Sequence, residues 1–132
     1  VFEQLHMYNV LLEGIILKPN MIISAIDCPV QADIEKVADL TYACLKENVP
    51  KDVPGIAFLS GGQSADLATL HLNKMNKKYS DMPWNLTFSY GRALQHDALN
   101  TWEGKIENRK EAQESLLLRA HNNSLATSGS KY

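Results

Sequence analysis

Three short apolar segments, each followed by a segment with helical spacing, constrain the fold of this chain more than any other feature. The apolar segments span residues 10–17, 55–59 and 84–89. Short apolar strands that alternate with helices are typical of a parallel β-sheet, because a crossover helix must return the chain to the same end of the sheet. We therefore predict an α/β fold in which helices cover the faces of a parallel sheet.

The helical segments are bounded by recognisable start and stop signals. The spacing predicts helices over residues 31–49, 63–76, 93–102 and 108–124. Ser64 is a candidate N-cap for the second helix, and the small, polar segment 126–132 is expected to fray. The apolar side of the last helix is predicted to carry Ala112, Leu116, Leu117 and Ala120.

Composition excludes several classes of partner. The 132 residues suffice for one modest core, and a formal net charge of −2 gives no reason to expect nucleic acid or an anionic membrane surface as partner. No apolar run reaches the roughly 18 residues of a membrane span. Cys28 and Cys44 form no CxxC pair, so we interpret them as buried, reduced thiols of an intracellular protein, with a disulfide as the alternative. The histidines lack ligand spacing, and no metal site is expected.

Polar residues and glycines follow each apolar segment at the point where the predicted strand ends. Lys18 follows the first segment, Ser60-Gly61-Gly62 the second, and Ser89-Tyr90-Gly91-Arg92 the third. The carboxyl ends of parallel strands share one edge, where ligands bind in barrels and in open sheets. We expect these residues to meet at that edge.

The residue types at this edge indicate a phosphorylated ligand beside a lysine. Helix N-termini after glycine turns bind anions through free N–H groups, and Arg92 offers a guanidinium that suits phosphate oxygens. The Lys18 amine could form an imine with a bound carbonyl, for which partial burial and a nearby cation would favour the free amine. Each feature alone has a simpler structural interpretation. Ser60-Gly61-Gly62 could be only a tight turn, Gly91-Arg92 only a helix start with a surface arginine, and Lys18 only a solvated strand end. Their coincidence on three successive strands favours the ligand site.

Longer motifs carry a resemblance to a known family. The segments LLEGIILKPNM (residues 11–21), VPGIAFLSGGQS (53–64), PWNLTFSYGRALQ (83–95) and RAHNNSLA (119–126) closely resemble class I fructose-bisphosphate aldolase, in the same order. The resemblance implies a TIM (β/α)8 barrel. Residues 1–132 would form the C-terminal part of this single domain, with the last three β/α units (strands six to eight) and the C-terminal helix.

The resemblance also implies a reaction and the residues that perform it. Members reversibly cleave fructose 1,6-bisphosphate to dihydroxyacetone phosphate and glyceraldehyde 3-phosphate through a lysine Schiff base, without metal or cofactor, in glycolysis and gluconeogenesis. Lys18 matches the Schiff-base lysine. The substrate-phosphate site of the family matches Ser60, Gly61, Gly62, Ser89, Gly91 and Arg92.

The resemblance covers only part of a barrel. An acid/base glutamate, further lysines and an aspartate of the family have no counterpart in this chain. We expect a partial sequence of a complete enzyme or a fragment completed by another chain, with little or no cleavage activity in isolation. One alternative is a non-catalytic scaffold or partner-binding protein that keeps the fold and the phosphate site. A more distant one is another imine-forming sugar-phosphate lyase or transferase on the same barrel.

The expected partners and compartment follow from the family as well. They are fructose 1,6-bisphosphate, triose phosphates, other subunits of a homotetramer and cytoskeletal proteins, and they include no nucleic acid and no membrane. A cytoplasmic location is expected, although plastid forms share these motifs and are distinguished only by their N-termini.

Overall fold

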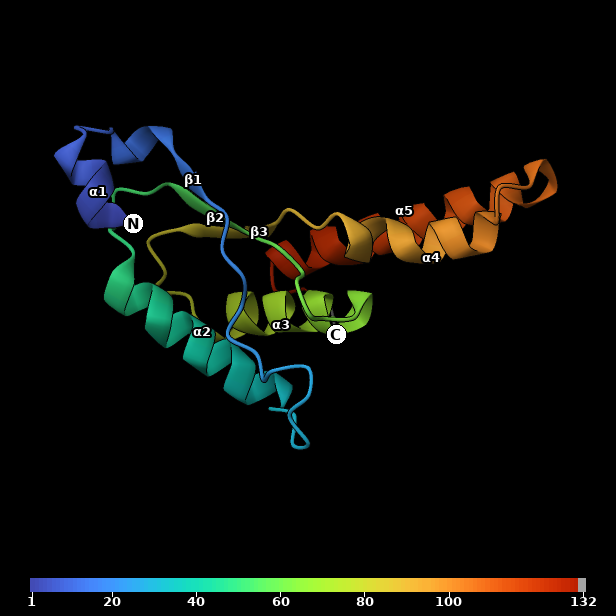
Figure 1. The fold of residues 1–132 in the computed structure, drawn as a ribbon, viewed down its shortest axis with the longest axis horizontal. Helices are drawn as coiled ribbons and strands as arrows, with labels where there is room; N and C mark the ends of the chain where they lie inside the picture. The colour runs from blue at the N-terminus through green and yellow to red at the C-terminus, as the bar shows by residue number, and fades with distance from the viewer. Residues whose placement is uncertain (131–132) are drawn as a thin grey trace.

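The computed structural model describes residues 1–130, and Figure 1 shows their arrangement. Three strands alternate with helices, as the sequence predicts. The elements are α1 (Phe2–Met7), the 3-10 helix η1 (Leu12–Gly14), β1 (Ile16–Leu17), α2 (Ile34–Asn48), β2 (Gly55–Phe58), α3 (Ala65–Lys78), β3 (Asn85–Phe88), α4 (Arg92–Trp102), the 3-10 helix η2 (Ile106–Asn108) and α5 (Arg109–Thr127).

The strands form one parallel sheet in the order β1-β2-β3. Leu17 pairs with Ile56, and Ile56 pairs with Leu86. Because all three strands run in the same direction, their carboxyl ends lie along one edge. The predicted α/β class and the parallel pairing are confirmed.

The helices cover one face of this sheet. In Figure 1, α2 and α3 lie on the same side of the strands, and α3 packs against both α2 and α5. The opposite face of the described sheet is open, since Ile16 at its edge is 61% exposed and Asn85 is exposed as well. The prediction of a sheet covered on its faces is therefore wrong for one face. Successive side chains of a strand point to opposite faces, so only every second residue reaches the helices.

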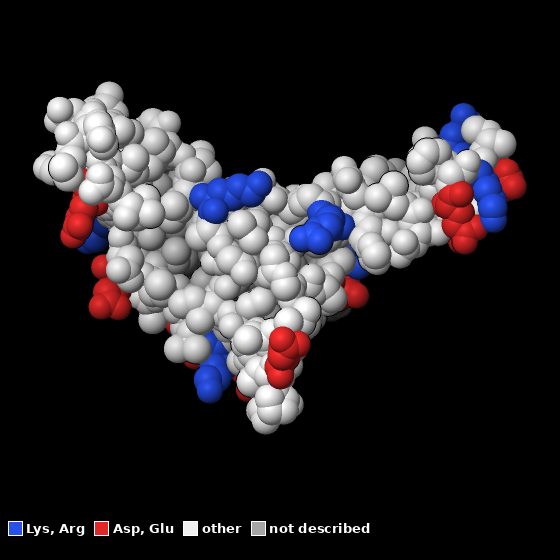
Figure 2. All heavy atoms as spheres, viewed as in Figure 1, with Lys and Arg blue, Asp and Glu red and all other residues white. Residues whose placement is uncertain are grey.

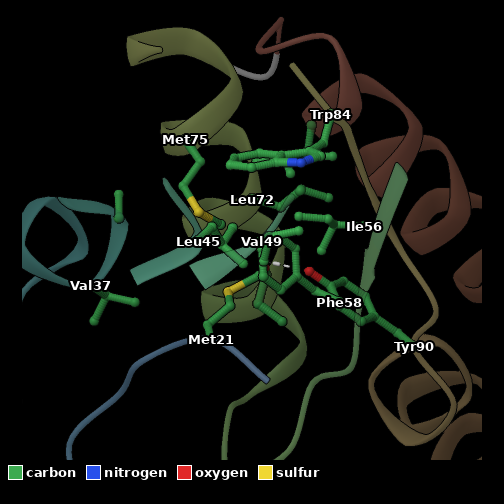
Figure 3. Packing of buried hydrophobic residues seen from close by; sticks show 14 of the residues in the cluster. Met21, Val37, Leu45, Val49, Ile56, Phe58, Leu72, Met75, Trp84 and Tyr90 are labelled. Carbon is green, nitrogen blue, oxygen red and sulfur yellow. Dashed lines mark hydrogen bonds between the residues drawn. The ribbon is translucent and has the colours of Figure 1, made fainter. Parts of the chain in front are cut away.

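The core lies between the sheet and the helices α2 and α3. Ile56 and Phe58 of β2 pack against Leu72 and Met75 of α3, and all four are fully buried (Figure 3). Burial of each such side chain contributes about 1.5–3 kcal/mol to folding. Trp84 closes the far end of this core, where its indole N–H donates to the carbonyl of Pro50 at 2.9 Å. The core thus holds β2 and β3 firmly against α3.

The N-terminal strand is much shorter than predicted. The segment 10–17 contributes only Ile16 and Leu17 to the sheet, and it is preceded by α1, which the sequence did not predict, and by η1. Asn9 takes a positive φ of 52°, which reverses the chain after α1. β1 pairs with β2 alone, so it receives little support from neighbouring strands.

The helix boundaries agree with prediction to within a few residues. Ser64 caps α3, and its hydroxyl accepts a hydrogen bond from the N–H of Leu67 at 3.3 Å, as expected. α2 begins later than predicted because the Asp33 carboxylate caps it and accepts from the N–H of Lys36 at 2.7 Å.

Three expectations about the surface and the last helix are wrong. Leu116 and Leu117 are 37% and 69% exposed, and the buried residues of α5 are Ala112, Arg119, Asn123 and Ala126. Cys28 and Cys44 are free but exposed rather than buried. Residues 126 and 127 complete α5, and Ser130 donates its N–H to the Leu125 carbonyl at 3.0 Å, so this part of the tail is ordered. Residues 131 and 132 of the segment expected to fray lie outside the described residues.

Candidate active site

The ends of the three strands line one open cleft of about 860 Å³. Seven of the eight residues that the sequence placed at this edge contribute to its wall, and the eighth, Tyr90, is buried instead. The seven are Lys18 after β1, Ser60, Gly61 and Gly62 after β2, and Ser89, Gly91 and Arg92 after β3. Residues separated by more than 70 positions in the sequence are thus brought together by the parallel sheet.

The segment after Lys18 is attached to the loop after β2. The carbonyl of Pro19 accepts a hydrogen bond from the N–H of Leu59 at 3.0 Å, and the Asn20 side chain donates to the Gly61 carbonyl at 3.2 Å. Proline cannot donate to a ladder, but its carbonyl still accepts. The Lys-Pro-Asn sequence therefore ends the strand and fixes its end against the neighbouring glycine loop.

The loop after β2 is a tight turn that leads into α3. The N–H of Gln63 donates to the Ser60 carbonyl at 3.0 Å, and Gly62 adopts a φ of +74°. For a residue with a side chain, this left-handed conformation is unfavourable by about 1–2 kcal/mol. Glycine at position 62 is therefore required by the turn, and it places the N-terminus of α3 at the cleft.

A buried tyrosine attaches the loop after β3 to helix α3. Tyr90 is 5% exposed, and its hydroxyl donates to the Ala68 carbonyl of α3 at 2.8 Å. Burial raises the pKa of this phenol, so Tyr90 stays neutral and acts as a structural donor. The N–H of Ser89 also donates to the Phe58 carbonyl at 2.8 Å, which joins this loop to the end of β2.

Two helices begin at the wall of the cleft. Ser64 and Gly91 are the N-caps of α3 and α4 and both line the cleft, as does Arg92, the first residue of α4. The first turn of a helix has N–H groups without intrahelical partners and carries a partial positive charge. With Arg92, the two helix starts make this part of the cleft suited to an anion.

Lys18 lies in the cleft but is exposed. Partial burial of this amine was expected from the imine chemistry, and within residues 1–130 this expectation is wrong. Lys18 follows Leu17 by one position, so strand alternation directs it to the same face as the exposed Ile16. That is the face of the sheet which the described helices leave open.

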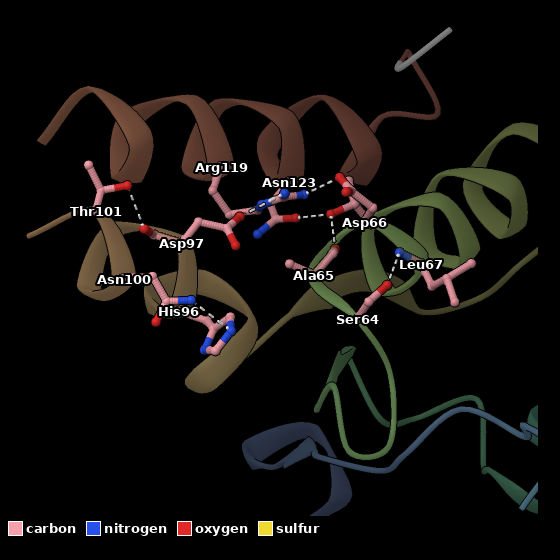
Figure 4. A network of polar contacts seen from close by, with 11 residues as sticks. Ser64, Ala65, Asp66, Leu67, His96, Asp97, Asn100, Thr101, Arg119 and Asn123 are labelled. Atoms are coloured by element: carbon pink, nitrogen blue, oxygen red, sulfur yellow. Dashed lines mark hydrogen bonds and ion pairs between the residues drawn. The ribbon is translucent and has the colours of Figure 1, made fainter. Parts of the chain in front are cut away.

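Four titratable residues of the cleft wall were not predicted as site residues. Arg119 of α5 donates from Nη1 to Asp66 Oδ1 at 2.7 Å and from Nη2 to Asp97 Oδ2 at 3.0 Å, and His96 lines the cleft beside them (Figure 4). Burial disfavours the charge of Arg119, but the hydrogen bonds to both carboxylates outweigh this effect and raise its pKa. The sequence signal was an arginine that directly follows the apolar run Leu116-Leu117-Leu118.

A buried histidine contacts Gln63, the residue that follows the glycine loop. His71 of α3 is 3% exposed, and its Nδ1 lies 2.8 Å from Oε1 of Gln63, which lines the cleft. Burial lowers the pKa of this imidazole, so the neutral form is favoured. His71 therefore orients Gln63 without adding charge to the cleft.

The surface charges are interspersed. On the face shown in Figure 2, lysine and arginine form separate patches over the middle of the molecule, with acidic residues mainly toward its margins. Within residues 1–130 no cluster of three or more His, Cys, Asp or Glu residues has the geometry to hold a metal ion. None of the described helices is long and apolar enough to cross a membrane.

Comparison with known proteins gives a consistent result. The family model of class-I fructose-bisphosphate aldolase matches residues 1–132. Fructose-bisphosphate aldolase B of Gallus gallus is 51% identical over 129 residues, which are 98% of this chain and 35% of that protein. The cytosolic aldolase 5 of Arabidopsis thaliana is 51% identical over 129 residues (98% of this chain, 36% of that protein), and the chloroplastic aldolase 1 of Pisum sativum is 52% identical over 132 residues (100% and 36%).

A solved structure shows the same fold. The fructose-bisphosphate aldolase of Plasmodium falciparum, solved in complex with TRAP and a small-molecule inhibitor, superimposes with a TM-score of 0.93 at 51% identity. The match covers 100% of this chain and 38% of that chain. The chain thus spans about a third of the length of the curated relatives it matches, 35% of the first of them.

Proposed function

The chain belongs to the class I fructose-bisphosphate aldolase family, and on this basis we propose that it carries the Schiff-base lysine and a phosphate site of a fructose-bisphosphate aldolase. The complete enzyme would reversibly cleave fructose 1,6-bisphosphate into dihydroxyacetone phosphate and glyceraldehyde 3-phosphate. The observation that carries the proposal is the cleft whose wall is formed together by Lys18, the two glycine loops and Arg92.

Lys18 would act as the nucleophile. Its uncharged amine adds to the C2 carbonyl of the substrate, and loss of water leaves a protonated imine. When a base removes the proton of the C4 hydroxyl, the C3–C4 bond breaks and its electron pair moves to the iminium nitrogen. Glyceraldehyde 3-phosphate then leaves. Protonation of the resulting enamine at C3 and hydrolysis of the imine release dihydroxyacetone phosphate and restore the amine.

The two loops would bind the phosphate next to the ketone. Charge-assisted hydrogen bonds from a guanidinium and from the N–H groups of a helix start are among the stronger interactions with a phosphate. The loops are fixed to each other through the end of β2, so the phosphate would be held at a constant distance from Lys18. The residues proposed for this role are Ser60, Gly61, Gly62, Ser89, Gly91 and Arg92.

The chain would supply strands six to eight of a TIM barrel within one domain. This proposal is supported by the open face of the sheet, by the parallel order β1-β2-β3 and by relatives nearly three times as long. The remaining strands would cover Lys18 and provide the acid/base group that the mechanism requires. They would also exclude water from the imine.

Assembly and location are proposed from the relatives. We propose that the complete protein acts in the cytoplasm or in a plastid, because the relatives include a cytosolic and a chloroplastic aldolase. A homotetramer is proposed from the family resemblance alone. One solved relative is in complex with TRAP, and a protein partner, including a cytoskeletal one, is proposed for this chain by analogy.

Turnover by the complete protein that carries this chain tests the proposal. Release of triose phosphates from fructose 1,6-bisphosphate is expected for the unmodified protein and for Lys51→Met, an exposed lysine outside the cleft. It should be abolished in Lys18→Met. A scaffold that merely keeps the fold would show no turnover in the unmodified protein, and an unchanged rate in Lys18→Met would refute the role of this lysine.

A further inference from the structure

A buried arginine joins the two helices that begin at the phosphate loops. Arg119 lies on α5, its side chain is 10% exposed, and its two terminal nitrogens contact Asp66 of α3 and Asp97 of α4. Figure 4 shows the guanidinium between the two helices, with both carboxylates directed toward it. Arg119, Asp66 and Asp97 all line the cleft that contains Lys18.

The two carboxylates are close in sequence to the predicted phosphate loops. Asp66 is the second residue of α3 and comes four positions after Gly62. Asp97 lies on α4, five positions after Arg92. A change in the spacing of these carboxylates therefore moves one phosphate loop relative to the other.

An arginine is suited to this connection. Its planar guanidinium presents donors in fixed directions and reaches two acceptors on different helices, whereas a lysine is a compact charge on a flexible stem. The carboxylates are 73% and 43% exposed, so each ion pair alone would be weak in water. The buried guanidinium gives both carboxylates a fixed partner.

A second contact keeps α5 in register with α3. The Thr69 hydroxyl lies 2.5 Å from Oδ1 of Asn123, which is fully buried one turn after Arg119. Arg119 is consequently held on a helix that is itself fixed to α3. Its guanidinium can then position α4 relative to α3.

We propose that Arg119 is a positioning residue that sets the spacing of the two phosphate loops through Asp66 and Asp97. This inference rests on the proposed function, because it concerns the same phosphate site. Arg119 would not touch the reacting carbonyl. Its loss should weaken binding of the phosphate group and leave the reactivity of Lys18 toward a ketone intact.

The test compares a phosphorylated and an unphosphorylated ketone in the complete protein. Borohydride reduction traps the Lys18 adduct with dihydroxyacetone phosphate or with dihydroxyacetone, and peptide mass gives the yield at each concentration. In Arg119→Met, the half-saturating concentration of dihydroxyacetone phosphate should rise about 10- to 100-fold, as misplaced binding groups typically cost. That of dihydroxyacetone should change by less than about twofold. Arg109→Met, an exposed arginine on the same helix, is the matched control and should change neither.

An equal rise in the half-saturating concentration of both ketones would overturn the proposal, because a purely structural role does not distinguish them. No rise for either ketone would overturn it as well. If the unmodified protein forms no Lys18 adduct with either ketone, the proposed function itself fails, which is a different result.

A milder set of variants keeps the test valid if Arg119→Met does not fold. Asp66→Ala and Asp97→Ala together remove both acceptors, which are more exposed than the guanidinium, and should raise the half-saturating concentration of dihydroxyacetone phosphate selectively. Arg119→Lys keeps the positive charge but loses the planar guanidinium. Its half-saturating concentration of dihydroxyacetone phosphate should lie between those of the unmodified protein and the double variant. If Asp66→Ala/Asp97→Ala binds dihydroxyacetone phosphate as the unmodified protein does, the proposal is overturned.

Discussion

The side-chain amide of Asn20 donates a hydrogen bond to the backbone carbonyl of Gly61 at 3.2 Å, although the two residues are 41 positions apart. This contact joins the segment that follows Lys18 to the glycine loop at the end of β2. Together with the bond from the Leu59 N–H to the Pro19 carbonyl, it fixes the proposed nucleophile relative to the proposed phosphate site.

Removal of this contact should affect ligand binding more than stability. Asn20→Ala is expected to lower the free energy of unfolding by about 0.5–1.5 kcal/mol, the typical net value of one hydrogen bond. It should also raise the concentration of dihydroxyacetone phosphate needed for half-maximal Lys18 adduct. Asn48→Ala removes a comparable bond to the Cys44 carbonyl, far from the cleft, and is the control for stability alone. Equal ligand binding in both variants would contradict the role of Asn20.

A side chain at position 62 should destabilise the fold. Gly62→Ala places a Cβ in the left-handed region at φ +74° and 3.0 Å from Cδ1 of Ile23, so a loss of about 1–2 kcal/mol in unfolding free energy is expected from chemical denaturation. Gly14→Ala is the matched control, because its φ is not positive and its Cβ would meet nothing within 4 Å. If the two variants are equally stable, the conformation of the glycine loop described above is wrong.

His71 should make stability depend on pH. Burial lowers the pKa of His71 below its ordinary value of 6.5. Below pH 6.5 the unfolded state therefore binds a proton that the folded state does not, and the free energy of unfolding falls as the pH decreases toward the folded-state pKa. Thermal unfolding of the unmodified protein and of His71→Gln between pH 5 and pH 8, about the range in which histidine titrates, measures the effect.

The unmodified protein should lose more stability than His71→Gln on acidification. His121→Gln, which changes an exposed histidine, should behave as the unmodified protein does. A pH dependence that is identical in His71→Gln and in the unmodified protein would show that this imidazole is not shielded from solvent.

The isolated 132-residue chain should cleave little or no fructose 1,6-bisphosphate. In the described structure Lys18 is exposed and one face of the sheet is open, so water would compete with the substrate at the imine. The base that the proposed mechanism requires is also expected from strands outside this segment. A coupled triose-phosphate assay on the purified chain measures this directly, and substantial turnover would contradict it.

Much of the fold was predictable because it depends on local signals. The apolar segments 55–59 and 84–89, the cap at Ser64 and the glycine turns led to a parallel sheet with eight residues expected at one edge. The structure places seven of them in one cleft and buries the eighth, Tyr90. The aldolase family was recognised from the motifs around Lys18, Ser60 and Arg92 and is confirmed by the family match.

What the sequence did not predict depends on contacts between distant elements. The apolar residues of α5 indicated Leu116 and Leu117 as its buried side, but α3 and α4 present Asp66 and Asp97 to this helix, and Arg119 is buried instead. The exposure of Lys18 could not be read from its neighbours either, because it depends on which face of the sheet the helices cover.

The most direct measurement is the position of the covalent adduct formed with dihydroxyacetone phosphate. Borohydride reduction of the complete protein with this ketone, followed by proteolysis and peptide mass analysis, should locate a single reduced adduct on the peptide that contains Lys18, and inorganic phosphate should suppress it by competing for the loops after β2 and β3. An adduct on another lysine, or none at all, would contradict the assignment of Lys18 as the nucleophile of this cleft.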